Sequence, residues 1–167
     1  MAEGRVSVVT GAGGAICGAI ARALAAAGDA VAIWDISREA AEKTAAQIGA
    51  AGGRAVGVSC DVLDAGAVGR ALERTERELG PVGALVNGAG GSRRSATTSA
   101  ELAFFDILPE ELMGTLALNY LSAVLPSQAV GRGFAARGSG AILNIASVAG
   151  LRPLTRSVAY SNGKAAL

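Results

Sequence analysis

Tyr160 and Lys164 are the residues whose types and spacing point most directly to chemistry. They stand four positions apart in a segment with helical spacing, so both side chains are expected on one face of a helix. A nearby ammonium group favours the phenolate form of a tyrosine, and such a pair could exchange a proton with an alcohol or a ketone. By itself, a Tyr-x-x-x-Lys spacing is usually a surface feature.

Two further polar residues precede this pair. Ser147 stands 13 residues before Tyr160, just past a predicted strand, and its hydroxyl could hold a carbonyl oxygen. Asn119 lies inside a long predicted helix, where its amide could bind a water or a free backbone carbonyl. Taken alone, Asn119 would be a polar residue on the helix surface.

A glycine-rich turn follows the first predicted strand, with the sequence Thr10-Gly-Ala-Gly-Gly-Ala-Ile-Cys-Gly18. Bare backbone N–H groups at the start of a helix can approach a pyrophosphate, and the helix dipole favours its negative charge. The strict GxGxxG pattern is not met, because Ile16 occupies the third glycine position. The alternative is a tight turn with no ligand. The cofactor-binding residues predicted here are Gly11, Gly13, Gly14, Ala15 and Ile16.

Asp35 follows the second predicted strand, 24 residues after Gly11. An acidic residue at about this spacing bonds the ribose hydroxyls of a dinucleotide and repels a 2′-phosphate, so NAD is the preferred cofactor. Arg38 lies close enough that NADP is not excluded. The alternative is that Asp35 only starts the turn into the next helix, with Ser37 as its cap.

The elements that must position these residues alternate between short β-branched runs and alanine-rich segments of helical spacing. Strands are predicted at residues 6–10, 30–35, 55–60, 82–87 and 141–146. Helices are predicted at 15–27, 38–51, 65–79 and 109–137, the last with a kink at Pro126, and a final helix begins near Val158. This alternation predicts an α/β fold, a Rossmann-like doubly wound parallel sheet of about five strands, in a single domain over residues 1–167.

Composition excludes several other classes of function. The net charge is +1 with no block of like charges, so we expect no binding to nucleic acid or to a membrane surface. The sequence has no histidine, which removes Ser-His-Asp catalysis and the commonest metal ligand, and no metal site is predicted. Two isolated cysteines and the lack of a signal sequence or an apolar span predict a soluble, cytoplasmic protein.

Taken together and in order, these motifs resemble the short-chain dehydrogenase/reductase (SDR) family from Arg5 to Leu167. The turn TGAGGAIC is similar to its TGxxxGxG motif, and the segment from Asn87 to Gly90 is similar to its NNAG motif. The resemblance implies a catalytic tetrad of Asn119, Ser147, Tyr160 and Lys164. It adds Asp61, Val62, Asn87, Ala89, Gly90, Tyr160 and Lys164 to the expected cofactor-binding residues.

The resemblance also implies a reaction, the NAD(P)-dependent oxidation of a secondary alcohol or reduction of a ketone. Ser147 would orient the substrate carbonyl and Tyr160 would donate or accept the proton. Lys164 would favour the phenolate and hold the nicotinamide ribose, while Asn119 would support a water that links Lys164 to solvent. Hydride would pass between the nicotinamide and the substrate carbon, without a metal. Family members generally form homodimers or homotetramers through the helix that carries Asn119 and the helix that starts near Tyr160.

Two departures from the family pattern bear on this expectation. Ala15 and Cys17 stand where the motif has glycines, and a thiol at the second of these positions takes room between helix and strand, so we expect weakened or rearranged cofactor binding. The chain also ends at Leu167, before the further strands and the substrate lid that family members carry, which would leave the fifth strand as an apolar edge. The alternative function is therefore a catalytically inactive dinucleotide-binding fragment or pseudoenzyme.

A looser resemblance concerns the segments NGAGGS and RPLTR and the long helix between them, which are similar to sugar-acid reductases of the mannonate oxidoreductase (fructuronate reductase) type. It implies that an arginine meets a substrate carboxylate, a bidentate contact that suits the guanidinium group. The candidates are Arg93, Arg94, Arg152 and Arg156. The alternative is that all four are solvated.

Overall fold

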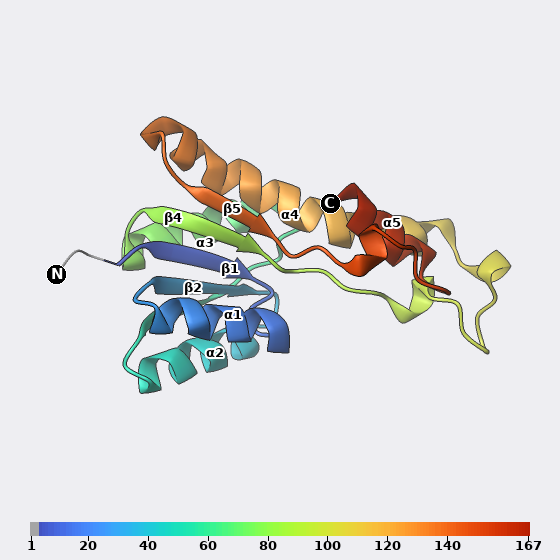
Figure 1. Cartoon of the computed structure of the whole chain (residues 1–167), viewed down its shortest axis with the longest axis horizontal. Coiled ribbons are helices and arrows are strands. Elements are labelled where there is room, and N and C mark those ends of the chain that lie inside the picture. The colour runs from blue at the N-terminus through green and yellow to red at the C-terminus, as the bar shows by residue number, and fades with distance from the viewer. Residues whose placement is uncertain (1–3) are drawn as a thin grey trace.

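A parallel sheet of five strands forms the centre of the computed structural model, which describes residues 4–167 (Figure 1). The strands are β1 (Val6–Thr10), β2 (Ala30–Asp35), β3 (Arg54–Ser59), β4 (Val82–Asn87) and β5 (Ala141–Asn144). Their order across the sheet is β3-β2-β1-β4-β5, and every neighbouring pair is parallel. The chain therefore changes direction across the sheet between β1 and β4, the switch point at which such folds bind ligands.

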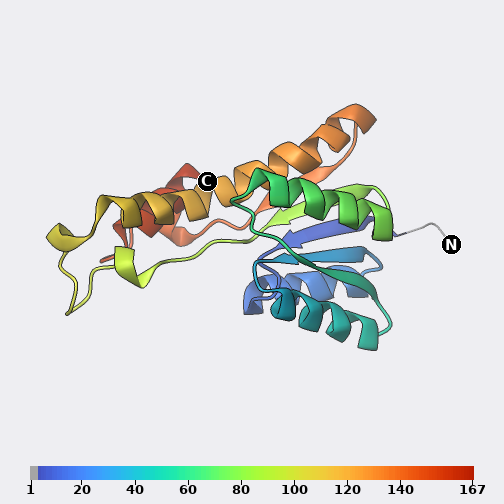
Figure 2. The same cartoon turned by 180° about the vertical axis from the view of Figure 1, so that it is seen from behind.

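Helices cover both faces of this sheet, as the connections between parallel strands require. They are α1 (Ala15–Ala26), α2 (Arg38–Ala50), α3 (Ala65–Leu79), α4 (Pro109–Arg137) and α5 (Val158–Ala166). The first two pack on one face, and α3 and α4 pack on the other, as the two opposite views show (Figures 1 and 2). The predicted α/β fold, a doubly wound Rossmann-like sheet, is confirmed.

The central strands are buried along their whole length because each face has its own layer of helices. Val8 and Trp34 belong to the core on the α3–α4 side, whereas Val9 and Ile33 belong to the core on the α1–α2 side. All four side chains are fully buried. The unbroken apolar runs in the sequence are the direct result, since nearly every residue of β1, β2 and β4 is buried.

Trp34 brings one polar atom into this core, and the structure supplies a partner for it. The indole Nε1 donates a hydrogen bond of 3.0 Å to Thr75 Oγ1, which in turn donates to the carbonyl of Ala71 at 2.8 Å. We predict that Thr75→Val lowers the free energy of unfolding by about 1–3 kcal/mol, because it leaves a buried N–H without an acceptor. Urea unfolding measures this, with the exposed Thr155→Val as the matched control; equal stabilities of the two variants would contradict the prediction.

The fifth strand is shorter than predicted, because the chain turns away after Asn144. The N–H of Ile145 still bonds the carbonyl of Asn87, but the carbonyl of Ile145 accepts a hydrogen bond from Lys164. The last two predicted strand residues therefore belong to the loop that leads to the site. The helix α4, in contrast, runs unbroken through Pro126.

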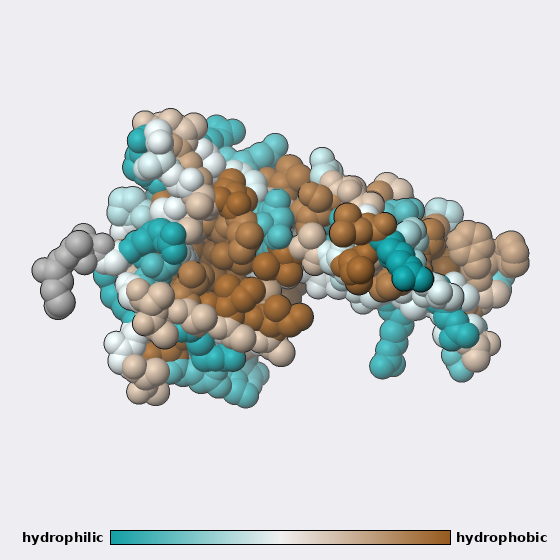
Figure 3. Space-filling model, viewed as in Figure 1, coloured by the Kyte–Doolittle hydropathy of each residue, from teal (hydrophilic) through white to brown (hydrophobic). Residues whose placement is uncertain are grey.

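The outer strand β5 has a neighbour on one side alone within residues 4–167, and its four residues are exposed. Ile142 and Leu143 are 43% and 56% exposed, so the expected apolar edge is present. Figure 3 shows hydrophobic surface over this side of the sheet. The helix α4 packs against one face of β5.

Candidate active site

A groove of about 440 Å³ opens at the carboxyl ends of β1, β2, β3 and β4, where the switch point lies. Most of the cofactor-binding residues predicted from the sequence line it, although they come from four separate loops. Its lining is Gly11, Gly13, Gly14, Trp34, Asp35, Ile36, Ala40, Cys60, Asp61, Val62, Gly88, Ala89, Gly90 and Leu118.

The turn between β1 and α1 gives this groove a floor of bare backbone. Gly11 has a φ of +68°, and a Cβ built on it would lie 2.9 Å from the Cα of Ala89, so any side chain here would push the two loops apart. The N-cap of α1 is Gly14, which offers no side chain to the free N–H groups, and the first turn carries no acidic residue. The positive end of α1 is thus left for an external anion.

Asp35 lies on the opposite wall of the groove and is hydrogen-bonded to this turn. One carboxylate oxygen accepts the N–H of Gly13 at 2.9 Å, and the other accepts the N–H of Ser37 at 2.9 Å. Ser37 in turn caps α2 by accepting the N–H of Ala40. Asp35 therefore starts the turn into α2, and it also lines the groove.

Sequence reasoning missed several residues of the groove. Ile36 and Cys60 flank the predicted Asp35 and Asp61 at strand ends, and that adjacency was the available signal. Burial raises the pKa of the Cys60 thiol to about 11, so it remains protonated at neutral pH and forms an apolar part of the wall. Leu118 reaches the groove from α4, and nothing in its local pattern marks it.

Five predicted cofactor residues lie outside this lining: Ala15, Ile16, Asn87, Tyr160 and Lys164. Ala15 borders a neighbouring surface groove between α1 and α2, and Ile16 is 70% exposed. Asn87 is buried below the groove, where its Nδ2 donates to Ser127 Oγ and to Asn144 Oδ1, both at 2.9 Å. Asn87, at the end of β4, is therefore hydrogen-bonded to both α4 and β5.

Asn119 is fully buried in α4, unlike the surface residue that its helix position alone would indicate. Its Nδ2 donates to the carbonyls of Gly91 (2.7 Å) and Thr115 (2.9 Å), and its Oδ1 accepts the N–H of Gly91 (3.1 Å). This side chain thus holds the loop after β4 against the helix. The backbone carbonyls that it bonds are those of Gly91 and of Thr115, one turn earlier in the same helix.

Lys164 is also buried, and a backbone carbonyl holds its ammonium group in position. Nζ donates to the carbonyl of Ile145 at 2.9 Å. A Cβ built on Gly90 would lie 2.9 Å from Asn119 Oδ1 and 3.4 Å from Lys164 Nζ, so these three residues converge at one point. A Cβ on Gly163 would lie 2.7 Å from that of Asn119, so the missing side chain lets α5 pack directly on α4.

Ser147 and Tyr160 complete the predicted tetrad from the loop after β5 and from α5. Ser147 Oγ accepts the N–H of Ala149 at 3.1 Å, which leaves its hydroxyl proton free to be donated. Gly150 lies so close to α5 that a Cβ would be 2.6 Å from the carbonyl oxygen of Lys164. The Tyr160 hydroxyl makes no hydrogen bond to the described part of the chain, and its side chain is half-buried.

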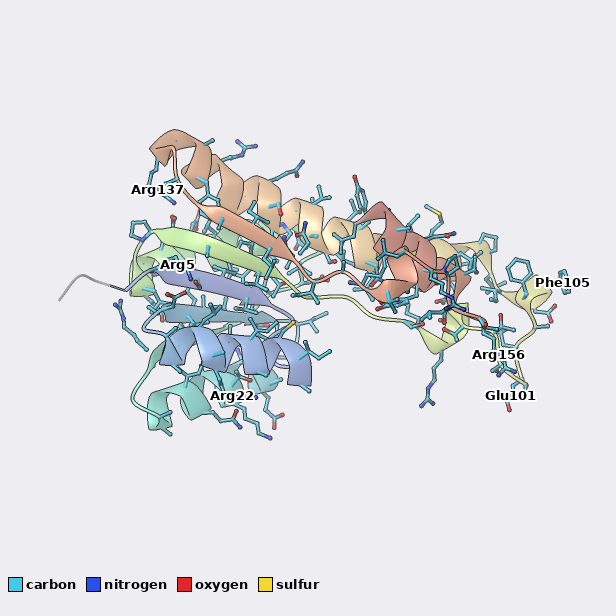
Figure 4. All side chains as sticks on the ribbon, in the orientation of Figure 1. Arg5, Arg22, Glu101, Phe105, Arg137 and Arg156 are labelled. Carbon is cyan, nitrogen blue, oxygen red and sulfur yellow. The ribbon has the colours of Figure 1, made fainter. Side chains whose placement is uncertain are left out.

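The four candidate arginines have separate positions. Arg156 lies with Glu101 and Phe105 at the end of the molecule away from the sheet (Figure 4). Arg93 instead lies along α4, where a Cβ on Gly114 would be 2.7 Å from its guanidinium. Gly114 is one helical turn from Leu118, which lines the groove. Arg94 and Arg152 are exposed.

The fold and this arrangement agree with a comparison to known families. Residues 5–167 match the family model described as short chain dehydrogenase, and the chain belongs to this family of oxidoreductases. No helix within residues 4–167 is long and apolar enough to cross a membrane.

Individual relatives place the chain more closely within the family. It is 39% identical to a D-threitol dehydrogenase of Mycolicibacterium smegmatis, over 97% of this chain and 60% of the relative. It is 36% identical to an uncharacterized oxidoreductase of Bacillus subtilis, over 98% of this chain and 62% of the relative. The chain therefore spans about three fifths of the length of these proteins.

A solved structure agrees in fold over almost the whole chain. It is a candidate D-mannonate oxidoreductase from Haemophilus influenzae with bound NAD, and it superposes with a TM-score of 0.92 at 34% identity. The match covers 99% of this chain and 62% of that one.

Proposed function

We propose that the chain forms the cofactor-binding and proton-transfer half of an NAD-dependent oxidoreductase that acts on a secondary alcohol or ketone. The observation that carries this proposal is the position of Gly90. It lines the groove, and its Cα faces both Asn119 Oδ1 and Lys164 Nζ. Gly90 thus connects the groove to Asn119 and Lys164, and in this proposal the groove and the tetrad form one site that joins dinucleotide binding to proton transfer.

The residues of the groove fit a dinucleotide. Gly11, Gly13 and Gly14 carry no side chains that would block a pyrophosphate, and the uncapped N-terminus of α1 that follows them would hold it. The apolar wall between Ile36 and Val62 suits an adenine ring, with Asp61 beside it. The nicotinamide, when bound, supplies or accepts a hydride. Lys164 Nζ lies next to Gly90, where the nicotinamide ribose would be held.

Asp35 favours NAD over NADP in this proposal. Its carboxylate is fixed by the N–H groups of Gly13 and Ser37, so it cannot turn away from a ribose 2′-position. A 2′-phosphate would meet a negative charge there. Arg38, the nearest cation along the chain, is drawn toward Glu42, with Nε 3.8 Å from the carboxylate.

Proton transfer falls to Tyr160 in this arrangement. Ser147 donates its free hydroxyl proton to the substrate oxygen and holds it, and Tyr160 Oη gives up or takes the substrate proton. The buried ammonium of Lys164 stabilises negative charge on that oxygen. Asn119 acts through the backbone, since both N–H groups of its amide donate to backbone carbonyls and its oxygen accepts the N–H of Gly91.

For the substrate class we propose a sugar acid. The description of the Haemophilus protein as a mannonate oxidoreductase supports it, and so does the position of Arg93 beside α4. The D-threitol dehydrogenase relative favours a neutral polyol instead. A panel that compares 2-keto- and 5-keto-hexuronates with threitol separates the two; turnover of threitol alone would reject the sugar acid.

Titration of the 167-residue chain with NADH, followed by nucleotide fluorescence, tests the proposal. We expect saturable binding and, with the ketone panel, oxidation of NADH. Absence of binding rejects the proposed function. Binding without turnover of any ketone, alcohol or sugar acid assigns the chain instead as a non-catalytic dinucleotide-binding module.

We also propose that the chain self-associates through α4 and α5, as a homodimer or homotetramer. The two helices pack together, and Met113, Tyr120 and Leu121 leave apolar surface on the outer side of α4. Light scattering after size-exclusion chromatography gives the mass; a monomer at micromolar concentration rejects this arrangement.

A further inference from the structure

The side chain of Cys17 occupies the space next to Gly88, although the two residues belong to different strand–helix units. Cys17 lies in the first turn of α1 and is 5% exposed, and Gly88 directly follows β4. A Cβ built on Gly88 would overlap Cys17 Sγ. The sulfur thus fills the position that any side chain at residue 88 would need.

The backbone at this point cannot move aside to relieve such an overlap. The N–H groups of Gly88 and Ala89 both donate to Thr10 Oγ1, at 3.0 and 3.1 Å. From the other side, Ser122 Oγ donates to the carbonyl of Ala89 at 3.0 Å. The segment is therefore clamped between β1 and α4, with Cys17 below it.

This contact joins two walls of the groove. The turn that contains Gly11, Gly13 and Gly14 leads directly into the helical turn of Cys17, and residues 88–90 form the opposite lining. The contact between Cys17 and Gly88 sets the spacing between these walls together with the close approach of Gly11 to Ala89. A larger side chain at residue 88 would therefore require a smaller side chain at residue 17.

We propose that Cys17 and Gly88 form an exchange pair that sets the separation between the phosphate-binding turn and the loop after β4. Cys17 is the positioning residue, acting through backbone and not on the cofactor itself. In the motifs quoted above, Cys17 stands in place of a glycine and Gly88 in place of an asparagine. The two departures are one reciprocal replacement, so the thiol removes no room that the fold needs.

The inference rests on the proposed dinucleotide site, and a double-mutant cycle tests it. Gly88→Asn alone should raise the NADH dissociation constant at least tenfold, because the new side chain meets Sγ and displaces the loop. Cys17→Gly alone should change it less than threefold. The double variant Cys17→Gly/Gly88→Asn should return within threefold of the wild-type value, a coupling that additive effects cannot produce.

The second cysteine provides the matched control. Cys60 is 2% exposed and also lines the groove, yet it is not among the nearest neighbours of a Cβ on Gly88. Adding Cys60→Gly to Gly88→Asn should therefore restore no binding. Equal weakness of the Cys17 and Cys60 double variants would overturn the exchange pair.

Unfolding temperatures separate failure of this inference from failure of the proposed function. If the wild-type chain binds no NADH, the function is rejected, and the pair is judged on stability alone. Gly88→Asn should then lower the midpoint and Cys17→Gly should restore it. If Gly88→Asn does not fold, Gly88→Ala takes its place in the same cycle; no recovery by Cys17→Gly in either background rejects the pair.

Discussion

Replacing Tyr160 by phenylalanine should lower the rate of NADH-dependent ketone reduction about 10²–10⁴-fold, the usual contribution of a positioned general acid. The substitution removes a single hydroxyl. That hydroxyl makes no hydrogen bond to residues 4–167, so no contact of the fold is lost with it. The unfolding midpoint and the dissociation constant of NADH should therefore change little. Steady-state kinetics and a fluorescence titration measure the two quantities on the same samples.

The other tyrosine of the chain provides a matched control variant. Tyr120 lies on the neighbouring helix α4 and is 41% exposed. Tyr120→Phe should leave turnover within about twofold of wild type, as surface changes usually do. If both variants turned over at wild-type rates, Tyr160 would not be the proton donor. A loss in both would point to damage of the α4–α5 packing.

Replacing Asp35 by asparagine should reverse or abolish the preference for NAD. The amide keeps one oxygen to accept an N–H group but removes the charge that would repel a 2′-phosphate. We expect weaker NADH binding and tighter NADPH binding, with a change of about tenfold or more in their ratio, equivalent to about 1.4 kcal/mol. Titration with both cofactors at one ionic strength measures this ratio.

The same charge change elsewhere controls for general electrostatics. Asp106 is exposed in the loop segment before α4, outside the groove. Asp106→Asn should leave the ratio of NADH to NADPH affinities unchanged. An equal shift in both variants would show that net charge, and not the ribose position of Asp35, sets the preference.

Much of the fold could be predicted because its physical causes are local in sequence. Unbroken apolar runs such as residues 30–35 are strands buried on both faces, and glycines at helix ends stop each helix. The predicted and observed elements differ by one or two residues at most boundaries. The two-residue difference at the end of β5 accompanies the hydrogen bond between Lys164 and the Ile145 carbonyl, which lies 19 positions away.

The site could be predicted in part for a different reason. Tyr160, Lys164 and the turn after β1 carry recognisable spacing, and strand ends identify Asp35 and Asp61. Leu118 could not be found this way, because its place in the groove depends on how α4 crosses the sheet. Nor could the placement of Asn87, whose partners lie 40 and 57 residues away.

By itself, the sequence determined the type and order of the elements, the candidates for proton transfer and the glycine-rich turn after β1. These follow from hydrophobic period, residue chemistry and short spacing. Only the tertiary structure decided that Asn119 is buried, that Gly90 lies between the groove and the side chains of Asn119 and Lys164, and that Cys17 packs against Gly88. The physical reason is that each of these depends on excluded volume between segments far apart in the chain, which no local pattern records.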